Sequence, residues 1–187
     1  MLTKIAKKLL SYQMANVFVP NFQSDTPGAT FIPIKGLAGT EKWGGLKFGG
    51  FYTNLITSMT ESGQNATFGF AFGTGTTAPT EDDYTIESII SSGLSLTGTP
   101  QKQYNLDSET GVYTVYYDLT LANTSESDIT INEVCNFSCV YPTTNKGDSP
   151  TTNVYNYFSV LMSRTVLDTP LIIPAGESGV IRYSMSY

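Results

Sequence analysis

From about residue 48 to the C-terminus, hydrophobic and polar residues alternate in short runs that are typical of β-strands. One run places Phe68, Phe70 and Phe72 on one side of a strand, and the last run alternates Ile181 and Tyr183 with polar residues. Turns rich in Gly, Pro, Asn and Asp separate the runs, without the helices that join parallel strands. The pattern predicts a mainly β domain, an antiparallel β-sandwich of the Ig-like or jelly-roll-like kind.

The N-terminal residues have a different periodicity. Apolar residues recur at the spacing of one helix face, and three lysines occupy the opposite face. The apolar positions are Leu2, Ile5, Ala6 and Leu9. The pattern predicts an amphipathic helix over residues 2–14, which is too short to be stable alone. We therefore expect it to pack on another surface, either that of a partner protein or that of its own acidic domain.

Between Pro20 and Gly50 the chain is rich in Pro and Gly, with aromatic and aliphatic residues between them. A free linker would be depleted of such apolar residues, so we expect an extended arm that buries them against its own domain or a neighbouring subunit. We assign residues 1–47 to the helix and this docking arm, and residues 48–187 to the β-sandwich. The residues expected to contact the partner are Leu2, Lys4, Ile5, Lys7, Lys8, Leu9, Leu10, Phe31 and Trp43.

The composition argues against several classes of function. The chain has 10 basic and 16 acidic residues, a net charge of −6, and this balance argues against nucleic-acid binding. It has no histidine, which excludes catalytic triads with a histidine base and the usual zinc ligand sets. No apolar stretch approaches the roughly 18 residues of a membrane span. We expect no enzyme activity, no catalytic residue, no cofactor and no metal site.

Two smaller groups of residues invite a metal or disulfide interpretation. Glu81, Asp82 and Asp83 offer oxygen ligands for calcium, but one acidic triplet in a loop is more often a solvated turn. Cys135 and Cys139 lie on one side of a predicted strand, about 13 Å apart at the rise of an extended chain, which is beyond the reach of a disulfide. We expect both cysteines to be small buried apolar residues.

Two residues of opposite charge interrupt apolar strand faces. By strand alternation Glu133 lies on the side of Ile131 and Cys135, and Arg164 lies on the side of Val160. An isolated buried charge is strongly destabilising, so each of the two needs a partner. We expect Glu133 and Arg164 to form a structural ion pair that joins two neighbouring strands.

Four segments share one construction, a turn next to a strand. They are Gly73–Glu87, Ile129–Glu133, Ser163–Leu167 and Ile173–Tyr183. In this order they resemble small β-rich virion proteins of tailed bacteriophages, which are tail, fibre-base or head-decoration components. The resemblance extends over residues 71–187. It implies a non-enzymatic building block located in the virion, with other virion proteins and further copies of itself as partners.

Two classes of function remain open. In the first, the protein is a structural virion subunit that docks through residues 1–47 and repeats around a symmetric particle. In the second, it is a host-surface carbohydrate-binding or adhesion module whose exposed Tyr and Thr residues bind a host glycan. The hydroxyl-rich composition is compatible with both, and a short chain without a repetitive fibre shaft favours the first.

Overall fold

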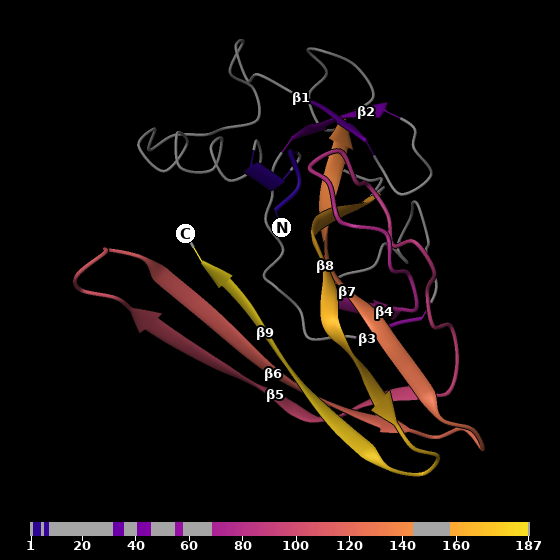
Figure 1. The fold of residues 1–187 in the computed structure, drawn as a ribbon. Helices are drawn as coiled ribbons and strands as arrows, with labels where there is room; N and C mark the ends of the chain where they lie inside the picture. The colour runs from indigo at the N-terminus through magenta and orange to yellow at the C-terminus, as the bar shows by residue number, and fades with distance from the viewer. Residues whose placement is uncertain are drawn as a thin grey trace.

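The computed structural model describes residues 2–4, 6–7, 32–35, 41–45, 55–57, 69–143 and 158–186 (Figure 1). The elements named in these ranges are all strands. They are β1 (Ile32–Lys35), β2 (Glu41–Gly45), β3 (Leu55–Ile56), β4 (Gly69–Gly73), β5 (Leu94–Leu106), β6 (Tyr113–Asn123), β7 (Ile129–Thr143), β8 (Phe158–Ile173) and β9 (Ser178–Ser186). The prediction of a mainly β chain is confirmed.

The strands form two sheets. In the larger sheet β7 is central and pairs with β2, β4 and β8, while β1 and β3 are attached through β2 and β4. The pairs are antiparallel except for β3 with β4. The smaller sheet has the antiparallel order β5-β6-β9. The chain passes between the two sheets at the β6–β7 and β8–β9 turns. Backbone hydrogen bonds of Asn123, at the end of β6, to Gly176 and Glu177 hold these two turns together.

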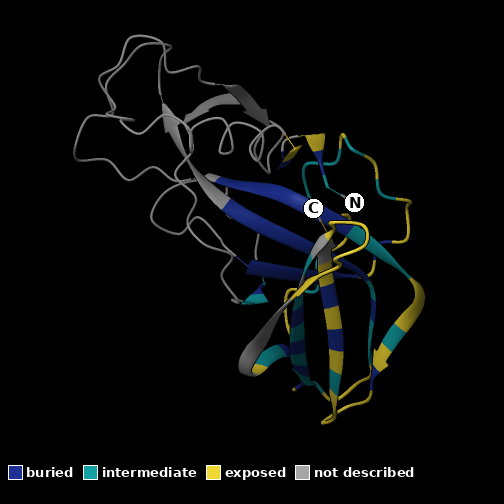
Figure 2. Cartoon of the chain, turned by 90° about the vertical axis from the view of Figure 1, so that its left-hand side faces the viewer, coloured by how far each residue is buried: buried dark blue, intermediate teal, exposed yellow. Residues whose placement is uncertain are grey.

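The main core lies between the two sheets. Phe70 of β4 meets Tyr183 of β9 edge-on, with ring centroids 5.0 Å apart, and Tyr117 of β6 at 5.6 Å. The other buried members are Phe72, Leu94, Leu119, Leu121, Ile131, Val134, Ile173 and Ile181. Figure 2 shows alternating buried and exposed residues in the smaller sheet and long buried stretches in the larger one. The larger sheet is therefore covered on both faces.

A second apolar cluster covers the face of the larger sheet that points away from the smaller one. Cys135, Phe137 and Leu161 pack there with Ile86, which belongs to the connection between β4 and β5. We call this connection, residues 74–93, the β4–β5 loop. Cys135 is free and buried, as expected, and burial raises the pKa of its thiol. The side chain of Cys139 lies outside the described residues.

The strand alternation inferred for β7 was right in placing Glu133 on the side of Cys135 and wrong in placing it on the side of Ile131. The pairing of β7 with β8 shifts its register between Ile131 and Glu133. Ile131 therefore belongs to the core between the sheets, whereas Glu133 alternates in step with Cys135 on the opposite face. An irregularity of this kind interrupts the alternation of faces along a strand.

The alternation was also wrong in β8. A second register shift leaves Met162 as an extra residue in this strand, because Ser163 pairs with Asn136 and Leu161 with Phe137. Arg164 consequently lies on the side of Leu161, not on the side of Val160. The extra residue thus turns Arg164 toward the face on which Glu133 lies.

The expected helix over residues 2–14 falls largely outside the described residues. In the described part, the Thr3 side chain accepts a hydrogen bond from the Ala6 amide at 3.1 Å, and the Thr3 carbonyl accepts one from the Lys7 amide at 3.0 Å. This is the geometry of a capped first helical turn. Among the described residues no longer helix is present.

The expected arm contains two strands of the larger sheet. The hairpin of β1 and β2 joins β7 through pairs that run from Trp43 with Thr143 to Gly45 with Tyr141. The sheet therefore crosses the boundary that we drew at residue 47. Short strands punctuated by Pro and Gly give no alternation by which a sequence reveals them. The rest of the arm lies outside the described residues.

Candidate functional site

The most buried charged side chains of the described residues belong to Glu133 on β7 and Arg164 on β8. The structure brings these two residues together, with Arg164 Nε 2.8 Å from Glu133 Oε2. Glu133 is completely buried and Arg164 is 4% exposed. Arg164 pairs in register with Cys135, two residues along from Glu133 on the same face, so its side chain reaches diagonally across the strand pair.

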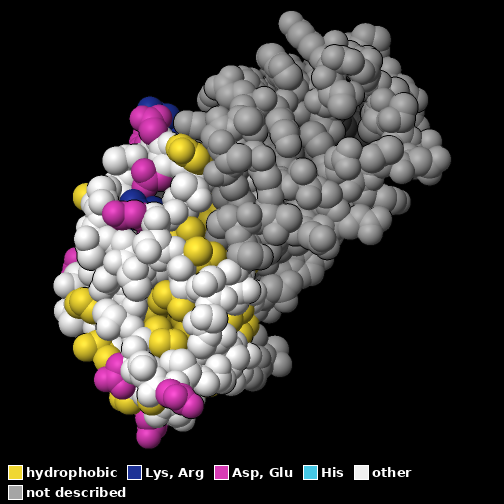
Figure 3. Space-filling view, turned by 90° about the vertical axis from the view of Figure 1, so that its right-hand side faces the viewer, with side chains coloured by type: hydrophobic (Ala, Val, Ile, Leu, Met, Phe, Trp, Pro, Cys, Tyr) yellow, Lys and Arg dark blue, Asp and Glu magenta, His cyan; other side chains and the backbone are white. Residues whose placement is uncertain are grey.

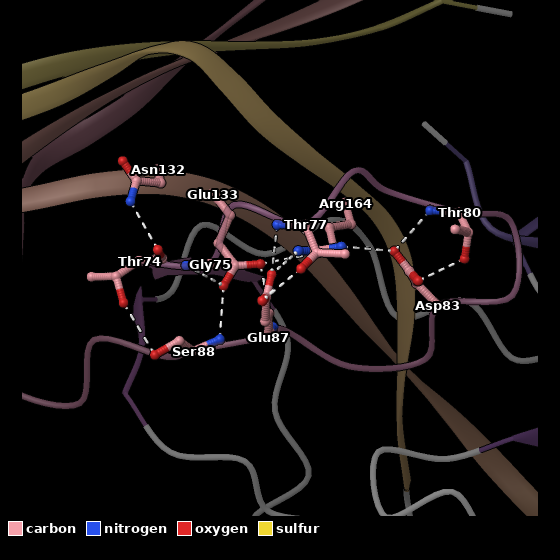
Figure 4. Close-up of polar contacts among 10 residues, drawn as sticks. All are labelled: Thr74, Gly75, Thr77, Thr80, Asp83, Glu87, Ser88, Asn132, Glu133 and Arg164. Carbon is pink, nitrogen blue, oxygen red and sulfur yellow. Dashed lines mark hydrogen bonds and ion pairs between the residues drawn. The ribbon is translucent and has the colours of Figure 1, made fainter.

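The Glu133 carboxylate accepts four hydrogen bonds (Figure 4). Its Oε1 accepts the backbone amides of Gly75 at 3.1 Å and Ser88 at 2.8 Å. Its Oε2 accepts the Glu87 amide at 3.3 Å and Arg164 Nε. The buried carboxylate is therefore fully satisfied, because two oxygens offer about four acceptor sites. Three of the four donors come from the β4–β5 loop, which Glu133 ties to the sheet.

Arg164 binds two further carboxylates from the same loop. Its Nη1 lies 3.1 Å from Asp83 Oδ2, and its Nη2 lies 2.8 Å from Glu87 Oε2. Asp83 in turn accepts the amide and the hydroxyl of Thr80 at 3.0 and 2.7 Å. Glu87 accepts the amide and the hydroxyl of Thr77 at 3.0 and 2.8 Å. We call Asp83, Glu87, Glu133 and Arg164 the Arg164 network.

The electrostatics of the network favour its charged form. Burial alone lowers the pKa of Arg164, but the hydrogen bonds that it donates to Glu133 and Asp83 outweigh this effect and raise the pKa. Burial raises the pKa of Asp83, whereas the Thr80 hydrogen bonds and Arg164 lower it by more. The Thr77 hydrogen bonds, followed by Arg164, lower the pKa of Glu87. All three pKa shifts are in the direction that favours the charged form of the group.

Two glycines leave room for the network. A Cβ atom on Gly73 would lie 2.4 Å from Glu133 Oε1, and one on Gly75 would lie 2.5 Å from the same atom. A Cβ on Gly75 would also lie 2.6 Å from the Glu87 carboxylate. Neither distance is sterically allowed, so these positions need glycine for close approach to the carboxylates.

The sequence did not identify Asp83 and Glu87 as partners of Arg164. Loop carboxylates of this kind are usually solvated, and nothing in their spacing reveals an arginine about eighty residues away. One local pattern pointed to the turn itself. Thr80 and Asp83 have the Thr-x-x-acid spacing of a capping box, and the Asp83 side chain accepts the Thr80 amide as in that motif.

The N-terminal segment, which we define as residues 2–7 and of which 2–4 and 6–7 are described, contacts β8 at Leu161–Ser163, which are buried in the chain. Leu2 forms an isolated antiparallel bridge with Ser163. The Thr3 amide donates to the Met162 carbonyl at 3.1 Å, and the Thr3 hydroxyl donates to the Leu161 carbonyl at 2.8 Å. These contacts fall at the extra residue of β8, where the bulge leaves carbonyl groups open to a new partner.

The lysines of the N-terminal segment pair with acids of the β4–β5 loop. Lys4 Nζ lies 2.8 Å from Asp82 Oδ1, and the Lys4 amide donates to the Glu81 carbonyl at 2.9 Å. Lys7 pairs with the Glu81 carboxylate. Figure 3 shows acidic side chains beside basic ones at one end of the described surface. With Asp83 bound to Arg164, each acid of the triplet has a cation of this chain as its partner.

The other residues expected to dock are not described in the same detail. Ile5, Lys8, Leu9, Leu10 and Phe31 lie outside the described residues. Trp43 is described through its backbone, which pairs with Pro33 and Thr143. Leu2, Lys4 and Lys7 thus contact their own domain, as in the fold-back alternative that the sequence left open.

A second arginine site lies on the exposed face of the smaller sheet. Arg182 of β9 binds Asp118 of β6 in a bidentate pair, with nitrogen to oxygen distances of 2.7 and 2.8 Å. Its guanidinium also lies 5.7 Å from the ring centroid of Tyr116. More than half of the Arg182 side chain is exposed, so this pair is screened by solvent.

Neither a family model, nor a curated protein, nor a solved structure matches the chain. Within the described ranges, no three Asp, Glu, Cys or His side chains are grouped so that they could hold a metal ion. The same ranges contain no helix long and apolar enough to cross a membrane.

Proposed function

We propose that the chain is a non-enzymatic structural protein of a tailed-bacteriophage virion, a repeated subunit of the tail or head surface. The observation that carries the proposal is the Arg164 network. Its members lie in Gly73–Glu87, Ile129–Glu133 and Ser163–Leu167, three of the segments that resemble small phage virion proteins. The residues behind the resemblance are thus the ones that fasten the β4–β5 loop to the sheet.

A structural role agrees with how these charges are used. The Glu133 oxygens are fully engaged by one guanidinium and three backbone amides. Asp83 and Glu87 divide their oxygens between Arg164 and threonines of the same loop. Carboxylates held in this way stabilise a loop, whereas a general acid or base needs a lone pair or proton aimed at a substrate.

We further propose that the two sheets constitute a β-sandwich that is displayed on the particle and docked through the N-terminal residues. Lys4 and Lys7 each form an ion pair with an acidic side chain. Partners with exposed carboxylates, whether other virion proteins or further copies of this chain, would satisfy them in the same way.

One observation favours host-glycan binding as the second candidate function. Tyr116, Asp118 and Arg182 form a polar and aromatic group on the exposed face of the smaller sheet. Aromatic rings flanked by hydrogen-bonding groups suit the apolar and hydroxyl faces of sugars. The cation over the Tyr116 ring competes with a sugar for that ring face, which makes this candidate weaker than the first.

The test is copurification with particles of the phage whose genome encodes the chain. Particles are banded on a density gradient, washed in high salt and analysed by mass spectrometry. The proposal predicts that the chain stays with infectious particles and that the purified protein binds no sugar on a glycan array. A chain found in infected cells and absent from washed particles contradicts it. Glycan binding that the Arg182→Met variant loses would favour the second candidate.

A further inference from the structure

The edge of β8 and the tip of the β4–β5 loop together form a surface shaped for a basic N-terminal segment. We define this receiving edge as residues 161–163 with Glu81 and Asp82. It offers the carbonyls of Leu161 and Met162 to the amide and hydroxyl of Thr3. The two acids then meet the lysines that follow Thr3 in the segment.

The receiving edge is also held by contacts that do not involve the N-terminal segment. Asp83 is fastened to Arg164 and to Thr80, and it directly follows Glu81 and Asp82 in the chain. The Arg164 network therefore fixes the position of both acids relative to β8. A surface with fixed acceptors loses little conformational entropy when a segment docks on it.

The contacts do not require that the segment belong to the same chain. They use main-chain carbonyls and two solvent-exposed ion pairs, which any copy of residues 2–7 would form equally well. Residues 8–31 separate the segment from β1, and 24 residues span at most roughly 80 Å. A domain of this length has a radius of gyration of only about 16 Å. The connection is thus long enough to reach a neighbouring subunit.

We propose that in the assembled particle the receiving edge of one copy holds the N-terminal segment of a neighbouring copy. This inference rests on the proposed function, because it names the partner surface through which repeated subunits dock. Exchange of an identical element costs little, since the same contacts are broken and remade. The contact seen within one chain is then the contact that joins two chains in the assembly.

The experiment uses two full-length variants with complementary defects. Lys4→Gln removes the amine and Asp82→Asn removes the carboxylate, and both side chains are largely exposed. A zero-length carbodiimide reagent joins a lysine to a carboxylate that it touches, and mass spectrometry identifies the joined peptides. Wild-type protein should give the Lys4–Asp82 product. Each variant alone should give none.

The two variants are then co-expressed and the particles that incorporate both are purified, so that Lys4 and Asp82 meet only if they come from different copies. With equal expression, half of the receiving edges keep Asp82 and half of the segments keep Lys4, so the inference predicts that the product reappears at about a quarter of the wild-type yield. A Lys4–Glu109 product, which reports random collisions, should stay at background. A product in the wild type that is missing from the co-expressed mixture overturns the inference. If the exchange fails this test but the chain still copurifies with particles, the proposed function stands. If the chain is absent from particles, the proposed function is wrong whatever the crosslinks show.

Discussion

Replacing Arg164 with methionine is the most informative perturbation of this fold. Methionine keeps much of the volume of the arginine stem and removes the guanidinium. Glu133 then stays completely buried with three backbone amides as its remaining donors. Asp83 and Glu87 lose the cation that holds them against the sheet. The β4–β5 loop is thereby released at two of its anchoring points.

The expected cost follows from burial. Removing one partner of a buried ion pair destabilises a protein by about 3 to 5 kcal/mol, because the other charge stays buried and uncompensated. Domains are stable by only about 5 to 15 kcal/mol in total. For a chain of 187 residues, each kcal/mol corresponds to a Tm change of about 2 to 4 °C, so we expect Arg164→Met to lower the Tm by roughly 6 to 20 °C.

The assay is thermal and urea unfolding, followed by circular dichroism at neutral pH. The matched control is Arg182→Met, which removes the chain's other arginine from an ion pair whose arginine is more than half exposed. We expect the control to leave the Tm nearly unchanged. Equal effects of the two substitutions, or an unchanged Tm for Arg164→Met, would refute the claim that the Arg164 network stabilises the fold.

The same substitution should change the response to acid. The folded state lowers the pKa of Asp83 and Glu87 below their ordinary values of 3.8 and 4.5. Their contribution to stability is therefore present above these values and is lost as the pH falls through the lower folded-state pKa values. In Arg164→Met the two shifts shrink, so Tm should fall less steeply with acid than in the wild type. Parallel Tm curves between pH 5 and pH 2 would contradict this.

Two further predictions concern neutral side chains. Gly75→Ala places a Cβ against the Glu133 carboxylate and should cost about 1 to 3 kcal/mol in urea unfolding, whereas Thr76→Ala beside it should change little. Asn123→Asp removes the amide that donates to the Ser127 and Ile173 carbonyls at 2.8 Å and should cost about 1 to 3 kcal/mol. The exposed Asn105→Asp is its control, and equal midpoints within either pair would count against these contacts.

The sequence predicted the class of the fold and the two ends of its buried ion pair. Glu133 and Arg164 stood out because a charge on an apolar strand needs a partner, and that reasoning does not depend on the exact register. Their faces were assigned wrongly because the pairing of β7 with β8 shifts its register at two places, and these shifts interrupt the alternation. Nothing in the hydrophobic pattern marks where a strand carries such a bulge.

The rest of the site depends on contacts between distant parts of the chain. Asp83 and Glu87 look like ordinary loop acids until the fold brings Arg164 beside them. The amphipathic pattern likewise places Lys4 on a charged face but does not identify its partner, because Asp82 lies 78 residues away in the sequence. Local spacing could have revealed only the Thr80 turn. Residues that are distant in the sequence and meet only in the folded chain can be identified as partners only from the structure.

The copy number of the chain per particle tests the central claim most directly. Gradient-purified particles are digested together with isotope-labelled standard peptides, and the chain is quantified against the major capsid protein by mass spectrometry. A repeated structural subunit predicts a fixed copy number that is a multiple of the symmetry of the tail or the head and does not change between preparations. A copy number that varies between preparations, or that falls below one per particle after a high-salt wash, would contradict the proposal that this chain is a building block of the virion.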